Sequence, residues 1–392
     1  MTMSYYVYFY KPGGKILECY FDNSATTKPT KEVVDAMVYA LTENYGNPSS
    51  LHIKGDEAKT ALDNARAKVA RAISANPNEI YFTSGGTESN NIAIFGTAQA
   101  LKRRGNRIVT TDIEHPSVLE PIRALEEQGF EVIRLHADEN GVVKESDINA
   151  AINEKTILVS MMLVNNEVGS IQPVAAAVKA VRRAKAPAQI HCDAVQAFGK
   201  LPINVRELGV DLISVSAHKV HGPKGQGALY VKKGTRLNPH VFGGGQEDNI
   251  RSGTHPMPGI LGLAAAVEGM NDISQSYEYV SGLRNVLLDN IRDMDNLFVN
   301  SPDNALPYIL NVSLVGIPSE VLRNYLSDRG ICVSTGSACS KGHRSKVLTS
   351  MGFDPKRIDS AIRISFSRFN TKEEIQYLAD CLREANESLR KR

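Results

Sequence analysis

The stretch of sequence that decides the fold is SVSAHKVHGPKG, residues 214–225. The run before it, VDLI at 210–213, is typical of a buried strand, and the glycines and the proline after Lys219 predict a loop. A lysine at the end of a strand, flanked by Ser216 and His218, suits an amine that loses its proton beside a bound anion. Most lysines are solvated surface residues, so this interpretation of Lys219 depends on the rest of the chain.

The composition is that of an ordinary globular protein. The chain of 392 residues is 42% hydrophobic, which is enough to build the core of one large domain or two. Its 45 Lys and Arg residues and 43 Asp and Glu residues leave a formal charge of +2 and are interspersed along the chain. We therefore expect neither direct nucleic-acid binding nor an anionic membrane partner.

The sequence predicts a cytoplasmic protein. No apolar run reaches the roughly 18 residues of a membrane span, and the first residues lack the pattern of a signal peptide. The five cysteines are odd in number and include no C-x-x-C pair, which fits free thiols in a reducing compartment; they are Cys19, Cys192, Cys332, Cys339 and Cys381.

Strand-like and helix-like segments alternate between about residue 80 and residue 233. The strand-like runs lie at 80–83, 107–110, 131–135, 156–160, 189–192 and 212–215, and the helical segments between them include 90–104, 117–128 and 174–185. This alternation is typical of βα units and predicts an α/β fold with a mostly parallel central sheet.

The chain is predicted to form two domains. Residues 20–271 would form the large α/β domain, although the first strand and loop near 20–30 can pack with the other domain. Helical segments at about 259–294, followed by strand-like runs at 310–314 and 331–334, predict a small α+β domain over 272–392. Residues 1–19 are an N-terminal extension whose order the sequence leaves open.

A glycine-rich segment, SGGTES at 84–89, follows the strand at 80–83. Its glycines allow the backbone to approach an anion closely, and a helix beginning near Asn90 would direct its first amides at that anion. The segment matches neither the P-loop nor the G-x-G-x-x-G fingerprint, which disfavours ATP and NAD. It predicts a phosphate site of another kind.

Polar side chains follow five of the predicted strands. These side chains are Thr87, His115, Asn166, Asp193 together with Gln196, and Lys219. The carboxyl ends of parallel strands meet at one edge of a sheet, so we expect a single pocket there. A phosphate cradle, a carboxylate, a flat side chain and a lysine are what pyridoxal phosphate requires, because the lysine forms a Schiff base and the carboxylate keeps the pyridine nitrogen protonated.

Ordered motifs along the chain resemble those of the cysteine desulfurases, class V of the fold-type I pyridoxal phosphate enzymes. The motifs are FDNSATT at 21–27, YGNPSS at 45–50, FTSGGTES at 82–89, EH at 114–115, VNNEVG at 164–169, DAVQ at 193–196, SAHK at 216–219, RSGT at 251–254 and SAC at 337–339. The resemblance spans roughly residues 19 to 385. It implies a PLP-transferase fold and a homodimer.

The resemblance assigns the residues that contact the ring of the cofactor. It implies Lys219 as the Schiff-base lysine, Asp193 as the partner of the pyridine nitrogen and His115 as the residue stacked on the ring. Asn166 and Gln196 would contact the ring hydroxyl.

The resemblance also assigns the residues around the phosphate. Gly86, Thr87, Ser216 and His218 would hold this group. Thr254 would reach it from the neighbouring subunit of the homodimer.

The substrate residues follow from the same resemblance. Arg363 matches the arginine that binds the carboxylate of L-cysteine, which suits its planar fork, and Asn47 would assist. Cys339 matches the nucleophile that takes the sulfur as a persulfide, leaving L-alanine, while Lys219 moves the α-proton and His115 serves as an acid or base for the thiol. A Gly-, Ser- and Lys-rich loop around Cys339 favours a reactive thiolate.

The remaining cysteines have other expected roles. We expect Cys332 to be a buried strand residue and Cys192 to pack beneath the cofactor ring. No metal site is predicted, because Cys332, Cys339 and His343 lack an evident fourth ligand.

Alternative functions remain open at this stage. A selenocysteine lyase or another class V enzyme would share the pocket, and a scaffold that binds sulfur-carrier proteins without catalysis would share the fold. The segment after Cys339, residues 340–346, is short and basic. It leaves open whether the sulfur acceptor or scaffold protein serves iron–sulfur cluster assembly or the thiolation of tRNA or a cofactor.

Overall fold

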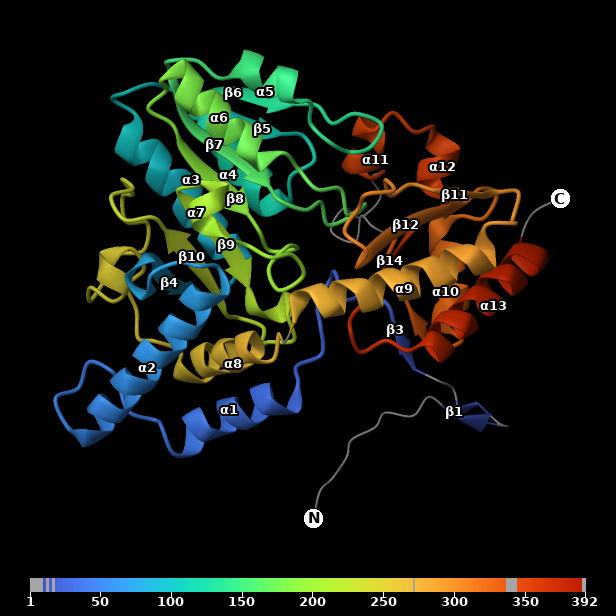
Figure 1. The fold of residues 1–392 in the computed structure, drawn as a ribbon, viewed down its shortest axis with the longest axis horizontal. Helices are drawn as coiled ribbons and strands as arrows, with labels where there is room; N and C mark the ends of the chain where they lie inside the picture. Colours follow the sequence, from blue (N-terminus) through green and yellow to red (C-terminus); the bar gives the residue numbers. More distant parts are fainter. Residues whose placement is uncertain (1–9, 12–13, 16–17, 271, 336–343, 390–392) are drawn as a thin grey trace. The chain divides into compact units, whose positions relative to one another are not determined.

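The computed structural model describes residues 10–11, 14–15, 18–270, 272–335 and 344–389 (Figure 1). Contacts between residues divide the chain into two units. The larger unit comprises Thr26–Asn166 and Ser170–Ser276, and the smaller unit comprises Met1–Ala25, Glu167–Gly169 and Tyr277–Arg392.

The larger unit is built around a seven-stranded sheet with the order β4, β10, β9, β8, β7, β5, β6. The strands are β4 (Ile80–Thr83), β5 (Arg107–Thr111), β6 (Glu131–Leu135), β7 (Thr156–Met162), β8 (Gln189–Asp193), β9 (Leu212–Ser216) and β10 (Gly227–Val231). Neighbours from β9 to β6 are parallel, whereas β10 is antiparallel to β9 and to β4. Every residue of β7 to β10 is buried, which explains why their apolar runs are nearly continuous. The prediction of a mostly parallel α/β fold is confirmed.

Helices pack on this sheet and on each other. They are α1 (Lys31–Thr42), α2 (Ile53–Ala72), α3 (Gly86–Leu101), α4 (Pro116–Glu127), α5 (Glu145–Ala151), α6 (Val174–Ala184), α7 (Val205–Leu208) and α8 (Met257–Glu268). Helix α3 contacts β4 and β7 to β10, and α6 contacts β7 and β8. Fully buried residues of α3 and α4, among them Ile94 and Ile122, form one core cluster with Ile108 of β5 and Leu158 of β7. Helices α1, α2 and α8 lie side by side (Figure 1).

Two features of this unit differ from the sequence-based expectations. Helix α3 begins at Gly86 and not near Asn90, so Thr87 lies in its first turn. Strand β10 was not predicted, and its antiparallel pairing makes residues 217–226 a connection between two adjacent strands. Lys219 therefore lies in a loop of a different kind from the βα connections that carry the other predicted site residues.

The smaller unit contains a three-stranded antiparallel sheet of β11 (Leu297–Val299), β12 (Ile309–Leu314) and β14 (Ala361–Ser365). Strand β3 (Cys19–Tyr20) pairs in parallel with β13 (Ile331–Cys332), and β1 (Tyr10–Lys11) pairs with β2 (Gly14–Lys15). Its helices are most of α9 (Ile273–Ile291), and α10 (Ser319–Ser327), α11 (Lys346–Ser350), α12 (Pro355–Asp359) and α13 (Lys372–Leu389). No helix in the described part of the chain is long and apolar enough to span a membrane.

Candidate active site

The loop that carries Lys219 folds back on Ala217. The backbone N–H groups of Val220 and Gly222 both donate to the carbonyl of Ala217, at 3.0 and 2.9 Å. A Cβ atom at residue 222 would lie 2.8 Å from that carbonyl oxygen, so only glycine allows this turn. The turn, which includes the 3₁₀ segment Ala217–Lys219, holds Lys219 partly buried at the carboxyl end of β9.

His218 is held in place by hydrogen bonds to the segment before α1. Its carbonyl oxygen accepts hydrogen bonds from the N–H and the hydroxyl of Thr27, at 2.9 and 3.0 Å, and its Nδ1 lies 3.2 Å from Oγ1 of Thr26. Burial, together with the positive charges of Lys219, Lys224 and Lys200, lowers the pKa of His218 to about 4. The imidazole is therefore neutral at pH 7, and the cations around it suit a bound anion.

A cradle forms where α3 begins. Gly85 has a φ angle of +148°, and a Cβ atom added to Gly86 would lie 2.7 Å from Cγ2 of Val195 and 3.8 Å from Cβ of Ser216. The start of α3, the end of β9 and the turn after β8 thus meet within van der Waals distance. Gly86 is the first residue of the 16-residue helix α3, so the positive end of the helix dipole lies at this meeting point.

Asp193 ends strand β8 with its carboxylate held at both oxygens. Asn90 Nδ2 donates to Oδ2 at 2.8 Å, and the N–H of Val195 donates to Oδ1 at 3.0 Å. Only 6% of Asp193 is exposed. The side chain is thus an oriented carboxylate at the same edge of the sheet as the Lys219 loop.

His115 is the N-cap of α4. Its Nδ1 accepts a hydrogen bond from the N–H of Ser117 at 3.1 Å. Burial lowers the pKa of His115, the negative charge of Asp193 opposes this effect, and the positive charge of Lys219 adds to it. The structure therefore brings His115, Asp193 and Lys219 within electrostatic reach of one another.

The other predicted residues of the larger unit differ in their exposure to solvent. Gln196 is buried and its Oε1 accepts from Lys200 Nζ at 3.3 Å, while Asn166 is partly buried. Thr87 is exposed, as are Asn47 and Thr254. Asn47 Oδ1 caps its own turn by accepting from the N–H of Ser49 at 3.0 Å.

The exposed Thr254 directly precedes His255, which belongs to a largely buried ionic cluster. Arg66 donates two hydrogen bonds to Glu247, both at 2.7 Å, and His255 Nε2 lies 2.7 Å from Glu247 Oε1. Burial alone would raise the pKa of Glu247, but the hydrogen bonds from Arg66 and His255 lower it to about 2. Residues 247–249 all have φ angles between 49° and 65°, an unfavourable conformation for side-chain-bearing residues that this cluster stabilises.

Arg363 belongs to the smaller unit. It lies in β14 with only 5% of its side chain exposed, and its Nη2 donates to Asp22 Oδ1 at 2.9 Å. Backbone hydrogen bonds to Ser334 hold the strand on its other side. The guanidinium is thus anchored by one carboxylate of the same unit.

The cysteines differ from expectation at one position. Cys192 is fully buried, and burial raises the pKa of its thiol well above the ordinary value, with Asp193 and Glu114 adding to the effect. The prediction that Cys332 is buried is wrong, because β13 leaves it half-buried. Cys339 and His343 lie outside the described residues.

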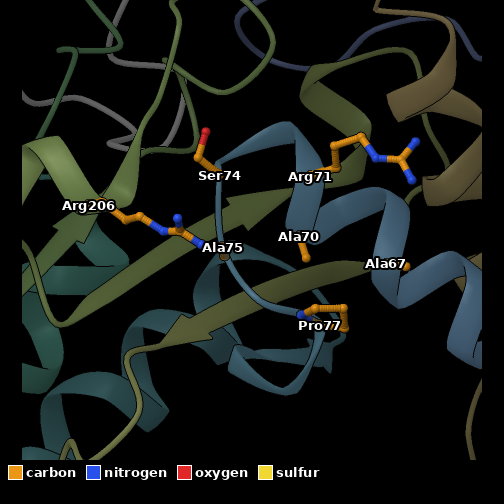
Figure 2. Close-up of a pocket in the computed structure, with 7 residues that line it drawn as sticks. All are labelled: Ala67, Ala70, Arg71, Ser74, Ala75, Pro77 and Arg206. Atoms are coloured by element: carbon orange, nitrogen blue, oxygen red, sulfur yellow. The ribbon is translucent and has the colours of Figure 1, made fainter.

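A separate hollow of about 410 Å³ lies at the end of α2 (Figure 2). Its lining consists of Ala67, Ala70, Arg71, Ser74, Ala75, Pro77 and Arg206, with the two arginines on opposite sides in Figure 2. None of these residues is among those predicted for the active site.

Comparison with known proteins identifies the family. The profile described as aminotransferase class-V matches residues 19–378. The cysteine desulfurase IscS of Dictyoglomus turgidum is 42% identical over 378 residues, which cover 95% of this chain and 95% of the relative. The chain belongs to the cysteine desulfurases. The desulfurase IscS of Methanosarcina thermophila is 43% identical over 377 residues, 95% of this chain and 92% of the relative.

Two solved structures share the fold. A NifS-like protein is 40% identical, with a TM-score of 0.89 over 95% of this chain and 99% of the other. SspA in complex with cysteine is 34% identical, with a TM-score of 0.79 over 90% of this chain and 100% of the other. The fold is that of the fold-type I enzymes, and the family depends on pyridoxal phosphate.

The larger unit of this cysteine desulfurase fits a pyridoxal phosphate group. Because Gly86 has no Cβ atom, the start of α3 can pack against Val195 and lie close to Ser216. Beside it lie a buried hydroxyl at Ser216, a partly buried lysine at Lys219 and an oriented carboxylate at Asp193.

Four residues near the site were missed by sequence reasoning. They are Asn90, Glu114, Ser117 and Lys200, all of which are buried. Glu114 belongs to the quoted EH motif and the other three lie within four residues of a quoted motif. Buried polar residues in or beside motifs are common, so only their contacts in the fold distinguish these four.

Proposed function

We propose that this enzyme converts L-cysteine to L-alanine and transfers the sulfur, as a persulfide on Cys339, to an acceptor protein. One observation carries the proposal: His115, Asp193 and Lys219 lie within electrostatic reach at the carboxyl ends of β5, β8 and β9, beside the glycine cradle. Membership of the cysteine desulfurase family supports it.

Pyridoxal phosphate, when bound, supplies an electron sink that stabilises negative charge on the substrate α-carbon. We propose that Lys219 bonds to the cofactor, that Asp193 pairs with its ring nitrogen and that His115 stacks on the ring. The proposed phosphate ligands are Gly86, Thr87, Ser216 and His218, and the proposed contacts of the ring hydroxyl are Asn166 and Gln196.

The charge of His218 and the hydrogen bonds of Asp193 support these roles. His218 is neutral at pH 7, so its ring can donate one hydrogen bond without adding a cation that would compete with Lys219. Asp193 keeps its carboxylate in one orientation through two donors, which suits a lasting pairing with a protonated ring nitrogen. The Lys219 amine is the group proposed to move the α-proton of the substrate.

Three further residues are proposed to act on the substrate and its sulfur. Arg363 is proposed to bind the substrate carboxylate, with Asn47 assisting, because a planar guanidinium suits bidentate binding. Its Nη2 also donates to Asp22 Oδ1 at 2.9 Å. Cys339 is the proposed sulfur acceptor.

The proposal extends to assembly and cellular role. A homodimer is proposed in which the exposed Thr254 reaches the phosphate site of the other subunit. We further propose a cytoplasmic location. The sulfur would be delivered to iron–sulfur cluster assembly or to the thiolation of tRNA or a cofactor. The IscS names of the relatives support the first of these pathways.

Alanine release from L-cysteine by the purified holoenzyme tests the activity. We expect Lys219→Ala to abolish it, whereas Lys179→Ala on the exposed face of α6 keeps it. Full activity of Lys219→Ala would overturn the proposal.

Mass spectrometry after incubation with L-cysteine tests the sulfur acceptor. We expect one added sulfur atom on the peptide with Cys339, lost in Cys339→Ser and kept in Cys332→Ser. Sulfur on Cys332 or Cys192 would contradict the assignment. Turnover of selenocysteine by the Cys339→Ser variant would instead indicate a selenocysteine lyase.

A further inference from the structure

A continuous chain of hydrogen bonds joins Asp193 to His115 through two side chains without a proposed role. Asn90 Nδ2 donates at 2.8 Å to Asp193 Oδ2 and at 2.8 Å to Ser117 Oγ, and Ser117 Oγ lies 2.7 Å from His115 Nδ1. Asn90 is fully buried and Ser117 is 9% exposed. This series of hydrogen bonds links β8, α3 and the first turn of α4.

The carboxylate of Asp193 determines the direction of the first two bonds. A carboxylate only accepts hydrogen bonds, so the amide atom of Asn90 that faces it is the nitrogen. Both amide hydrogens are then used, one on Asp193 and one on Ser117. Asn90 Oδ1 is buried and has no hydrogen-bond partner among the described residues, as expected if the nitrogen contacts fix the orientation of the amide.

The backbone of Ser117 determines which nitrogen of His115 carries the proton. An N–H group can only donate, and that of Ser117 points at Nδ1 from 3.1 Å, so Nδ1 must offer a lone pair. Ser117 Oγ already accepts from Asn90 and has its own hydrogen to donate to the same nitrogen. The proton of the neutral ring therefore lies on Nε2.

We propose that Asn90 and Ser117 are positioning residues that hold His115 as the Nε2–H tautomer and Asp193 in its oriented state. His115 then presents a hydrogen-bond donor to the groups that react, and not the lone pair of a general base. This inference rests on the proposed function, because the proposed function places the cofactor ring against His115. The inference narrows the role of His115 from an acid or base for the thiol to a hydrogen-bond donor.

Burial favours the neutral form of the imidazole. The two charged groups that act on His115 are Asp193 and Lys219, and burial is the largest influence, lowering the pKa of the ring. A proton on Nδ1 would also face the N–H of Ser117 at close range. Neutral histidines that donate from a fixed nitrogen are a known means of polarising a substrate.

The ring ¹⁵N spectrum of histidine-labelled holoenzyme tests the inference, with His115→Gln to assign the signals. We expect a pyridine-like shift for Nδ1 of His115 and a pyrrole-like shift for Nε2. In Ser117→Ala one of the two donors to Nδ1 is lost, and the ratio of the two tautomers should fall about fivefold, the effect of one ordinary hydrogen bond.

Asn90→Ala tests the other end of the chain. It removes a hydrogen bond to a charged group, so the dissociation constant of pyridoxal phosphate should rise by about 10- to 100-fold, measured by visible absorbance. The matched control is Thr97→Val, which removes another buried hydrogen bond between α3 and β8, from Thr97 to Gln189 at 3.1 Å. It should leave the tautomer and the cofactor affinity unchanged.

The outcomes separate this inference from the proposed function. A pyrrole-like Nδ1 in the unaltered protein, or equal effects of Thr97→Val and Ser117→Ala on the tautomer ratio, overturns the inference. The expected spectrum without alanine release from L-cysteine would instead retain the inference about the tautomer and overturn the proposed function.

Discussion

Glu114 is a carboxyl group that the fold keeps protonated near neutral pH. Its Oε1 accepts from the hydroxyl of Thr111 and from the N–H of Met162, both at 2.8 Å, but Oε2 is buried without a hydrogen-bond partner among the described residues. Burial, with help from the negative charges of Asp193 and Asp112, raises its pKa to about 8. The neutral acid can lie near Asp193 without adding a second buried negative charge.

Glu114→Gln should flatten the dependence of stability on pH. The folded-state pKa of about 8 lies above the ordinary value of 4.5, so the folded protein binds more protons between these values and loses stability as pH rises through them. The loss is at most about 1.4 kcal/mol per pH unit. Unfolding of the holoenzyme at saturating cofactor, from pH 5 to about pH 8, measures it.

The surface variant Glu139→Gln is the control for this prediction, because Glu139 is exposed. It should keep the slope of the unaltered protein. If Glu114→Gln shows the same slope as well, Glu114 is not the group responsible.

The start of helix α3 depends on the absence of a side chain at residue 86. In Gly86→Ala the new methyl group would lie 2.7 Å from Cγ2 of Val195, so either the helix or the turn after β8 must move. Overpacking of this kind costs about 1–3 kcal/mol, and we expect cofactor affinity to fall by about 5- to 100-fold. Absorbance titration with pyridoxal phosphate measures the change.

Val195→Ala should rescue Gly86→Ala, because it removes the methyl group that the new Cβ meets. Gly282→Ala in α9 is a matched control: a Cβ atom there meets nothing within 4 Å. This control should keep cofactor affinity and add about 0.5–1 kcal/mol of stability, the usual gain of alanine over glycine in a helix. Failure of the rescue would show that the cradle does not depend on this contact.

The ionic cluster of Arg66, Glu247 and His255 joins α2 to residues 247–255, the segment that includes Thr254. Glu247 also accepts from the N–H of Phe82 in β4 at 2.8 Å, so a single carboxylate connects three parts of the larger unit. Only 17% of the Arg66 side chain and 2% of the Glu247 side chain are exposed. Removing one partner leaves a buried charge.

Arg66→Met should therefore destabilise the folded protein by about 3 kcal/mol. Denaturant unfolding measures this loss, and Lys68→Met on the same helix, whose ion pair with Glu268 is more exposed, is the control. If the proposed homodimer forms, sedimentation should also show weaker association, because residues 247–249 would lose the cluster that holds their left-handed backbone. Equal losses in both variants would contradict the special role of the cluster.

At the scale of the whole molecule, the sequence predicted the parallel sheet because its strands are continuous apolar runs. It predicted Lys219, Asp193 and His115 for a related reason: polar residues directly after such runs stand out. It missed β10 and the early start of α3, because each begins at a glycine that follows a glycine-containing segment, and such a segment equally predicts a loop.

The supporting residues could not be predicted, because their partners are distant in sequence. Asn90 and Asp193 are separated by 103 positions, and Glu247 and Arg66 by 181. Only the folded sheet places these pairs together. The half-buried Cys332 could not be predicted either, because the pairing of β13 with β3 joins segments more than three hundred positions apart.

The loop between β9 and β10 also bears on the order in which the protein folds. Its ends, Ser216 and Gly227, face each other in register, so the loop that carries Lys219 closes over a short segment of chain. Short closures cost little entropy and form early, whereas the contact of Asn90 with Asp193 must wait for a hundred residues to assemble between them. The lysine is thus expected to be in place before the carboxylate that it works with, and retention of the cofactor should be among the last properties the refolding chain acquires.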